Sequence, residues 1–133
     1  MMMSSCGEKQ NPLTQQWDTP FGIAPFSEIK AEHYKPAIMA ALEEHNNEIE
    51  AIINNPETPN FENTIVAMEQ SGALLSRVSN LFFVLNNCCT SDQMQTIAQN
   101  VTPKLTELGN DISLNPELFA RVKAVYDQRA ELN

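Results

Sequence analysis

The sequence has 133 residues, 42% of them hydrophobic, and this length suffices for one globular domain. Eight basic residues stand against seventeen acidic ones, so the formal net charge is −9 at pH 7. This acidic balance argues against a nucleic-acid-binding protein and against contact with an anionic membrane surface, because both need a basic face.

Residues 1–12 have the composition of a disordered leader or tether. The stretch MSSC at residues 3–6 resembles the box that ends in the lipidated cysteine of bacterial lipoproteins. The charged and apolar regions of an export signal are absent from this sequence. Two interpretations follow: a disordered start, or, if translation begins upstream, a lipidated Cys6 followed by a polar tether.

Residues 7–30 combine isolated large apolar side chains with Pro20, Gly22 and Pro25. The segment is too apolar for a free linker and too interrupted for a helix. It predicts an extended N-terminal arm laid over the helices, within a helical domain that spans residues 13–133.

The first predicted helix covers residues 32–54, where apolar residues follow the spacing of one helix face. Pro36 is best tolerated in a first turn, which places the helix start near His33. The sequence NNP at residues 54–56 ends the helix.

The second predicted helix covers residues 60–88. Asn60 stands where an N-cap accepts backbone N–H groups, and Glu62 lies in the first turn, where the helix dipole favours negative charge. Apolar stripes on two faces indicate a central helix, with Gly72 allowing a slight bend or a close helix approach. We expect four of its side chains to lie in helix–helix contacts: Met68, Leu75, Leu81 and Phe82.

Two adjacent cysteines, Cys88 and Cys89, end this second helix, and with Cys6 they bring the total to three. An odd number with a vicinal pair is not a disulfide framework. Neighbours on a helix point about 100° apart, so the two are poorly placed to bridge each other. We expect both to be small, partly buried apolar residues.

The third predicted helix covers residues 91–112, with Thr90 and Gln93 spaced as a capping box. Its apolar stripe crosses Pro103, which predicts a kinked helix or two helices end to end. The fourth covers residues 116–131 and follows an N-cap at Asn115. The chain is therefore predicted to be all-α, built from antiparallel helical hairpins or a bundle.

Candidate catalytic residues are scarce. The two histidines, His33 and His45, both lie in the first helix, and no H-E-x-x-H zinc motif occurs. His45 and Glu48 have i, i+3 spacing, but a second such pair is missing, so His45 is interpreted as a boundary residue. No base accompanies Cys88 or Cys89 in sequence, and phosphate-binding loops are absent. No catalytic, cofactor-binding or metal-binding residue is predicted.

Three stretches resemble the N-terminal region of the thimet-oligopeptidase family of zinc metallopeptidases, and in particular its peptidyl-dipeptidase members. They are TPFGIAPFSEIKAEHYKPAI, NFENTIVAMEQSGALLSRVSNLFF and DISLNPELFARVKAVYDQR, within a likeness that runs from about residue 17 to residue 129. The most specific part is F-E-N-T-I followed by S-G-x-L-L-x-R-V.

The resemblance implies the N-terminal helical part of a larger enzyme that releases dipeptides from the C-terminus of short unstructured peptides. In that family one zinc ion is held by H-E-x-x-H and a later Glu, far C-terminal to the region matched here. The zinc and the catalytic domain would therefore belong to a missing C-terminal part. This chain would supply part of the wall around a deep channel and would not be an enzyme by itself.

Two other interpretations stay open: a free-standing helical interaction module without activity, and an independent enzyme with a convergent site. The absence of a helix-stop signal before Asn133 leads us to expect a piece of a longer protein. If Cys6 is lipidated, the expected location is the periplasm, anchored to a membrane through that residue alone. The alternative location is the cytoplasm.

Overall fold

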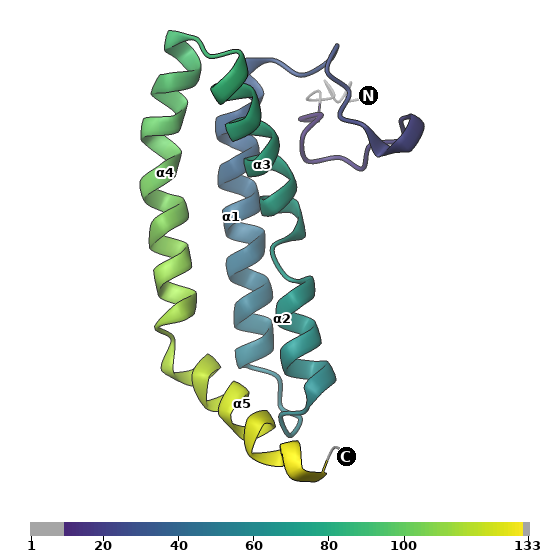
Figure 1. Cartoon of the computed structure of the whole chain (residues 1–133), viewed down its shortest axis with the longest axis vertical. Coiled ribbons are helices and arrows are strands. Elements are labelled where there is room, and N and C mark those ends of the chain that lie inside the picture. Colours follow the sequence, from purple (N-terminus) through teal and green to yellow (C-terminus); the bar gives the residue numbers. More distant parts are fainter. Residues whose placement is uncertain (1–9, 132–133) are drawn as a thin grey trace, which may run out of the picture.

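The computed structural model describes residues 10–131, and this part of the chain consists of helices and their connections, with no strand. Three long helices lie side by side: α1 (Ala31–Ile53), α3 (Ala73–Cys88) and α4 (Asp92–Ser113). The shorter α2 (Ala67–Gln70) precedes α3, and α5 (Pro116–Asp127) crosses the far end (Figure 1). Helix α3 runs opposite to both α1 and α4, which confirms the predicted all-α arrangement with antiparallel helices.

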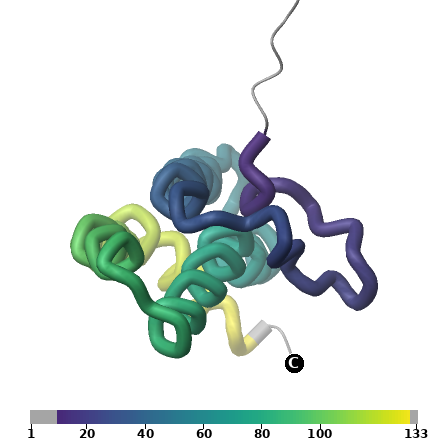
Figure 2. Tube along the Cα trace, turned by 90° about the horizontal axis from the view of Figure 1, so that it is seen from above, coloured from purple at the N-terminus to yellow at the C-terminus, as the bar shows by residue number. Residues whose placement is uncertain are grey.

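Helix α1 is the central element, because it contacts α2, α3, α4 and α5, and the prediction that the helix over residues 60–88 would be central is wrong. Viewed from above, these three helices form a triangular group with the N-terminal arm to one side (Figure 2). Ten buried side chains make the main core, here named the large cluster. Its members are Leu13, Tyr34, Ala37, Ile38, Leu42, Val78, Phe82, Met94, Ile97 and Val101.

A second core lies where the last turns of α1 meet α5. It contains three buried side chains, Ile49, Ile52 and Leu118, and is here named the small cluster. Met68 packs against this cluster, while Leu75 and Leu81 pack against the large one and Phe82 is a member of it. The predicted packing of these four residues is thereby confirmed.

The start of α1 differs slightly from the prediction. The helix begins at Ala31, and Pro36 lies in its second turn, not its first. The imidazole of His33 accepts a hydrogen bond from the Lys30 backbone N–H at 3.1 Å and so caps the start. This cap holds the helix end even though Pro36 cannot donate a backbone bond.

The predicted continuous helix 60–88 is wrong, because the chain forms three elements there. A six-residue π-helix, η2 (Phe61–Val66), leads into α2, and the helix is then interrupted at Ser71 and Gly72 before α3 begins. Gly72 has φ of +70°, a left-handed conformation that glycine adopts at little cost. The predicted N-cap is confirmed, since the Asn60 side chain accepts from the Asn63 N–H at 2.8 Å.

Helix α4 passes through Pro103 as a single element, so the alternative of two helices end to end is wrong. Its N-cap is Ser91, whose hydroxyl accepts from the Met94 N–H at 3.2 Å, and not Thr90. The cap of α5 agrees with the prediction: the Asn115 side chain accepts from the backbone N–H groups of Glu117 and Leu118, both at 2.9 Å.

The N-terminal arm contacts the helices at a few points. Leu13 is fully buried in the large cluster, and Trp17 and Ile29 pack against it. The arm's contacts begin at Asn11, whose side-chain amide donates to the His33 carbonyl at 2.7 Å. Between these points the arm leaves the helices, and Phe21 is completely exposed. It therefore covers the bundle only in part.

Candidate functional site

The two histidines serve the packing of the helices. His33 caps α1, as described above, and His45 of α1 lies against the helix break at Gly72. A Cβ atom at position 72 would lie 2.7 Å from Cε1 of His45, so the imidazole occupies the space that a side chain would need. The predicted close approach at Gly72 is thus present, between α1 and the start of α3.

Glu48 completes this contact. Its carboxylate accepts a hydrogen bond of 2.7 Å from the Gly72 backbone N–H, at the first turn of α3. A negative charge is favourable there, because helix N-termini carry unpaired N–H groups and a positive partial charge. The i, i+3 pair of His45 and Glu48 therefore fixes the α2–α3 break.

Metal binding finds no support in the described part of the chain. Among residues 10–131, no three His, Cys, Asp or Glu side chains lie close enough together to hold a metal ion. A zinc ion of the kind that the family resemblance implies does not fit these residues. We therefore assign no metal-dependent step to them.

The cysteines depart from the prediction. Cys88 and Cys89 are both exposed, not partly buried. Cys88 is the last residue of α3, and Cys89 lies outside the helix with φ of −139° and ψ of 47°. The apolar pattern of α3 ends before the pair, so neither side chain is turned into a core. Cys6, the lipidation candidate, lies outside the described residues.

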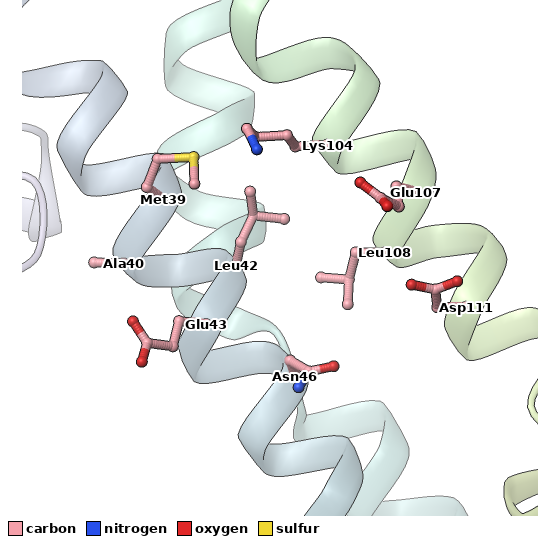
Figure 3. A pocket seen from close by; sticks show the side chains of 9 residues that line it. All are labelled: Met39, Ala40, Leu42, Glu43, Asn46, Lys104, Glu107, Leu108 and Asp111. Carbon is pink, nitrogen blue, oxygen red and sulfur yellow. The ribbon is translucent and has the colours of Figure 1, made fainter.

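A groove of about 500 Å³ between α1 and α4 is the best candidate for a binding surface. Leu42 of α1 and Leu108 of α4 point into it, and Met39 lies near one end (Figure 3). Four charged side chains line the groove, namely Glu43, Lys104, Glu107 and Asp111.

The composition of this groove indicates what it can do. Three carboxylates outnumber one ammonium group around an apolar floor, so the groove favours an apolar segment that carries positive charge. It contains no histidine, cysteine, serine or threonine among its lining residues. The lining therefore suits the binding of such a segment, and it lacks the serine–histidine and cysteine–histidine pairs of common nucleophilic sites.

Two arginine side chains join segments that are distant in the sequence. Arg77 of α3 donates to the Leu13 and Gln15 carbonyls at 3.2 and 3.0 Å, and its guanidinium lies 4.7 Å from the centre of the Trp17 ring. It therefore fastens the arm to α3.

Arg121 of α5 has no counterpart in the sequence predictions. It is buried, with 9% of its surface exposed, and donates to the Asn55 carbonyl at 2.9 Å and to the Asn63 side chain at 3.3 Å. Because its partners lie about 60 residues away in the chain, no sequence spacing could have indicated them. It joins α5 to the segment that connects α1 with α2.

Several large apolar side chains are exposed on the described surface. They include Val84, Leu114, Phe119 and Tyr126, each more than 60% exposed, and Phe61 at 52%. No helix among residues 10–131 is both long and apolar enough to cross a membrane.

The sequence is similar to the sequences of several known bacterial proteins. The dipeptidyl carboxypeptidase of Salmonella typhimurium is 46% identical over 122 residues, and that of Escherichia coli is 43% identical over the same length. Oligopeptidase A of Haemophilus influenzae is 28% identical over 98 residues, which cover 74% of this chain and 14% of that protein. No protein-family model matches the sequence.

The alignments cover a large share of this chain but a small share of each relative. The two dipeptidyl carboxypeptidase alignments include 92% of this chain but only 18% of each relative. The chain thus spans less than a fifth of the length of these relatives. It is homologous to the N-terminal region of bacterial dipeptidyl carboxypeptidase and is related to oligopeptidase A.

Proposed function

We propose that this chain is the N-terminal helical segment of a zinc metallopeptidase that releases dipeptides from the C-terminus of short unstructured peptides. The observation that carries the proposal is the identity of 46% and 43% with two dipeptidyl carboxypeptidases over 92% of the chain. In this proposal the zinc ligands and the catalytic groups lie in the larger part of the enzyme that the chain does not span.

The contribution of the segment is structural: its helices form part of the wall around the channel that admits the peptide. A wall must keep its shape so that folded proteins stay out. The capped helices, the large cluster and the fixed break at Gly72 suit that task. The exposed apolar residues Leu114, Phe119 and Tyr126 of the α4–α5 region supply a surface for contact with the remainder of the enzyme.

A chimera tests this proposal. The matched N-terminal segment of the Escherichia coli dipeptidyl carboxypeptidase is replaced by the corresponding residues of this chain, and release of a C-terminal dipeptide from a short N-terminally blocked peptide is measured by mass spectrometry. The control is the same enzyme with the segment deleted. We expect the chimera to be active and the deletion variant to be inactive or to cleave folded proteins as well.

Two results would contradict the proposal. If the chimera is folded and monodisperse but releases no dipeptide, the segment does not serve as the wall of such an enzyme. If the deletion variant retains both activity and selectivity for short peptides, the wall role itself is wrong.

The proposal extends to location through Cys6. If the natural precursor begins upstream of residue 1, signal cleavage leaves Cys6 as a lipidated first residue, and the enzyme works on peptides in the periplasm. Cells that carry the native gene are labelled with a palmitate analogue and fractionated. Label on the full-length product in the membrane fraction supports this part. An unlabelled product in the cytoplasmic fraction overturns it and leaves the peptidase proposal intact.

A further inference from the structure

The adjacent thiols of Cys88 and Cys89 have a geometry that a continuous helix would not give them. Consecutive helical residues point about 100° apart, which keeps their side chains separate. Here the chain leaves the helix between the two residues, since Cys88 ends α3 and Cys89 has φ of −139° and ψ of 47°. The backbone N–H of Cys89 still donates to the Leu85 carbonyl at 2.8 Å, so the junction is anchored.

The two side chains also interact. The Cys88 thiol donates a weak hydrogen bond to the Leu85 carbonyl, with a sulfur–oxygen distance of 3.7 Å. A hydrogen bond with Cys88, together with repulsion from its thiolate form, raises the pKa of the Cys89 thiol. Both thiols are exposed, and they lie on consecutive residues at the point where the chain leaves α3.

The surroundings do not favour a reactive thiolate. Low-pKa cysteines lie at helix N-termini or beside cationic groups. This pair lies at the C-terminal end of α3, where the helix dipole is negative, and no Lys, Arg or His occurs between Arg77 and Lys104 in the sequence. The pair also lacks the further ligands of a zinc site, as no group of three metal-binding side chains exists among residues 10–131.

A ligand suited to the pair must be soft, must need only two sulfur atoms and must react with neutral thiols. Thiol sulfur selects soft, thiophilic elements. Arsenic in its trivalent state with one organic substituent meets these conditions, because the substituent occupies its third position. We propose that Cys88 and Cys89 form an exposed dithiol site that binds monosubstituted trivalent arsenicals.

The chemistry balances without an oxidant. Two S–H bonds break and two S–As bonds form, while the two hydroxyl groups of the arsenical leave with the two protons as two water molecules. Arsenic stays trivalent and the sulfurs keep their oxidation state. The product is one ring that includes both sulfurs and the peptide bond between the cysteines. This inference does not depend on the proposed peptidase function.

The probe for the test is phenylarsonous acid, the hydrated form of phenylarsine oxide. The full 133-residue chain is used with Cys6→Ser, so that only the pair carries thiols. Intact-mass spectrometry is followed during addition of the probe in excess monothiol, and the protein thiols are titrated after the small molecules have been removed. We expect one phenylarsenic group per chain, loss of two titratable thiols, and release by a small dithiol such as 2,3-dimercaptopropanol.

Matched variants carry Cys88→Ser or Cys89→Ser in the same background, with circular dichroism as a check on folding. Linking two weak contacts in one site raises apparent affinity by about 10²–10⁴-fold, so each single variant should lose about that factor. If the variants bind as tightly as the two-thiol chain, or if the two-thiol chain takes up two arsenicals, the pair does not act as one site and the inference is wrong.

Discussion

Around the first half of α1, ten buried side chains of the arm, α1, α3 and α4 form the large cluster, whereas around its last turns only three form the small cluster. The second region compensates with polar contacts. Arg121 reaches the Asn55 carbonyl and the Asn63 side chain, and the Gln128 side chain donates to the Pro59 carbonyl at 3.0 Å. One end of the molecule is thus held mainly by burial, with hydrogen bonds that fasten the arm, and the other largely by hydrogen bonds.

The difference shows how a short helix such as α5 can be fixed without a large core. Its two buried apolar residues, Leu118 and Val125, lie on the same side as the buried Arg121. A hydrogen bond to a charged donor contributes about 1.5–3 kcal/mol, which is comparable to burial of one aliphatic side chain. At this end of the bundle, directed hydrogen bonds thereby supply stabilisation that a larger apolar core supplies at the other end.

The largest expected effect comes from the large cluster. Phe82 is fully buried between Tyr34 and Phe83, with ring centroids 5.2 and 5.1 Å away. Phe82→Ala should lower the free energy of unfolding by about 3–5 kcal/mol, because it leaves a cavity in a close-packed core. Urea unfolding followed by circular dichroism measures this loss. Phe119→Ala, at a position 66% exposed, is the control and should change it by about 0.5 kcal/mol or less.

Replacing Arg121 by Met should weaken the other region through its hydrogen bonds. The substitution keeps much of the apolar stem but leaves the Asn55 carbonyl without its donor, and we expect a loss of about 3 kcal/mol. Arg129→Met, in the turn after α5, is the control, since Arg129 is exposed and its contacts are the stacking on the Tyr126 ring and a hydrogen bond of 3.0 Å to the Tyr126 carbonyl. We expect a loss of about 1 kcal/mol or less. Equal losses for both variants would contradict the assigned role of Arg121.

Gly72 lies between the two regions, where α2 gives way to α3. Gly72→Ala should cost about 1–3 kcal/mol, because the left-handed backbone is unfavourable for alanine and the new Cβ meets His45. The double variant with His45→Ala separates the two causes. It should recover the steric part and retain the backbone part, as a double-mutant cycle of unfolding free energies would show. No coupling between the two positions would mean that the imidazole does not restrict this break.

The two regions also differ in how far the sequence could predict them. Helix limits followed from apolar spacing around the large cluster, and from caps such as Asn115 in the other region. The break at Gly72 did not, because glycine inside a helix costs only about 1 kcal/mol and so leaves a continuous helix acceptable. Arg121 was missed because an arginine beside valines resembles an ordinary surface residue of an amphipathic helix.

The candidate groove could not be predicted from the sequence for a similar reason. Its two sides come from α1 and α4, and facing residues such as Leu42 and Leu108 are more than 60 residues apart in the sequence, so no spacing could place them opposite each other. The i, i+4 spacing of Glu107 and Asp111 was a weak indication, because it places both carboxylates on one helix face, at the acidic edge of the groove. The exposure of Cys88 and Cys89 depended on where α3 ends, a boundary that apolar periodicity does not fix.

The smallest expected effect concerns Tyr34, a polar group inside the apolar region. Its hydroxyl is buried and has no hydrogen-bond partner among the described residues, and burial raises the pKa of this tyrosine above its ordinary value. Tyr34→Phe should therefore not lower stability at pH 7 and should raise it by up to about 1 kcal/mol, because no hydrogen bond is lost and a desolvation cost disappears.

The effect of Tyr34→Phe should grow in alkaline solution. With the folded pKa above the unfolded value of about 10, the unfolded chain ionises first, so the contribution of Tyr34 to stability is lost as the pH rises past 10. Phenylalanine cannot ionise, and the advantage of the variant should be larger at pH 10.5 than at pH 7 in urea unfolding. Tyr126→Phe, which removes an exposed tyrosine hydroxyl, serves as the control at pH 7. A loss of stability at pH 7 on removing the Tyr34 hydroxyl would instead reveal a partner for it, and the apolar region would then rely on polar contacts as the other region does.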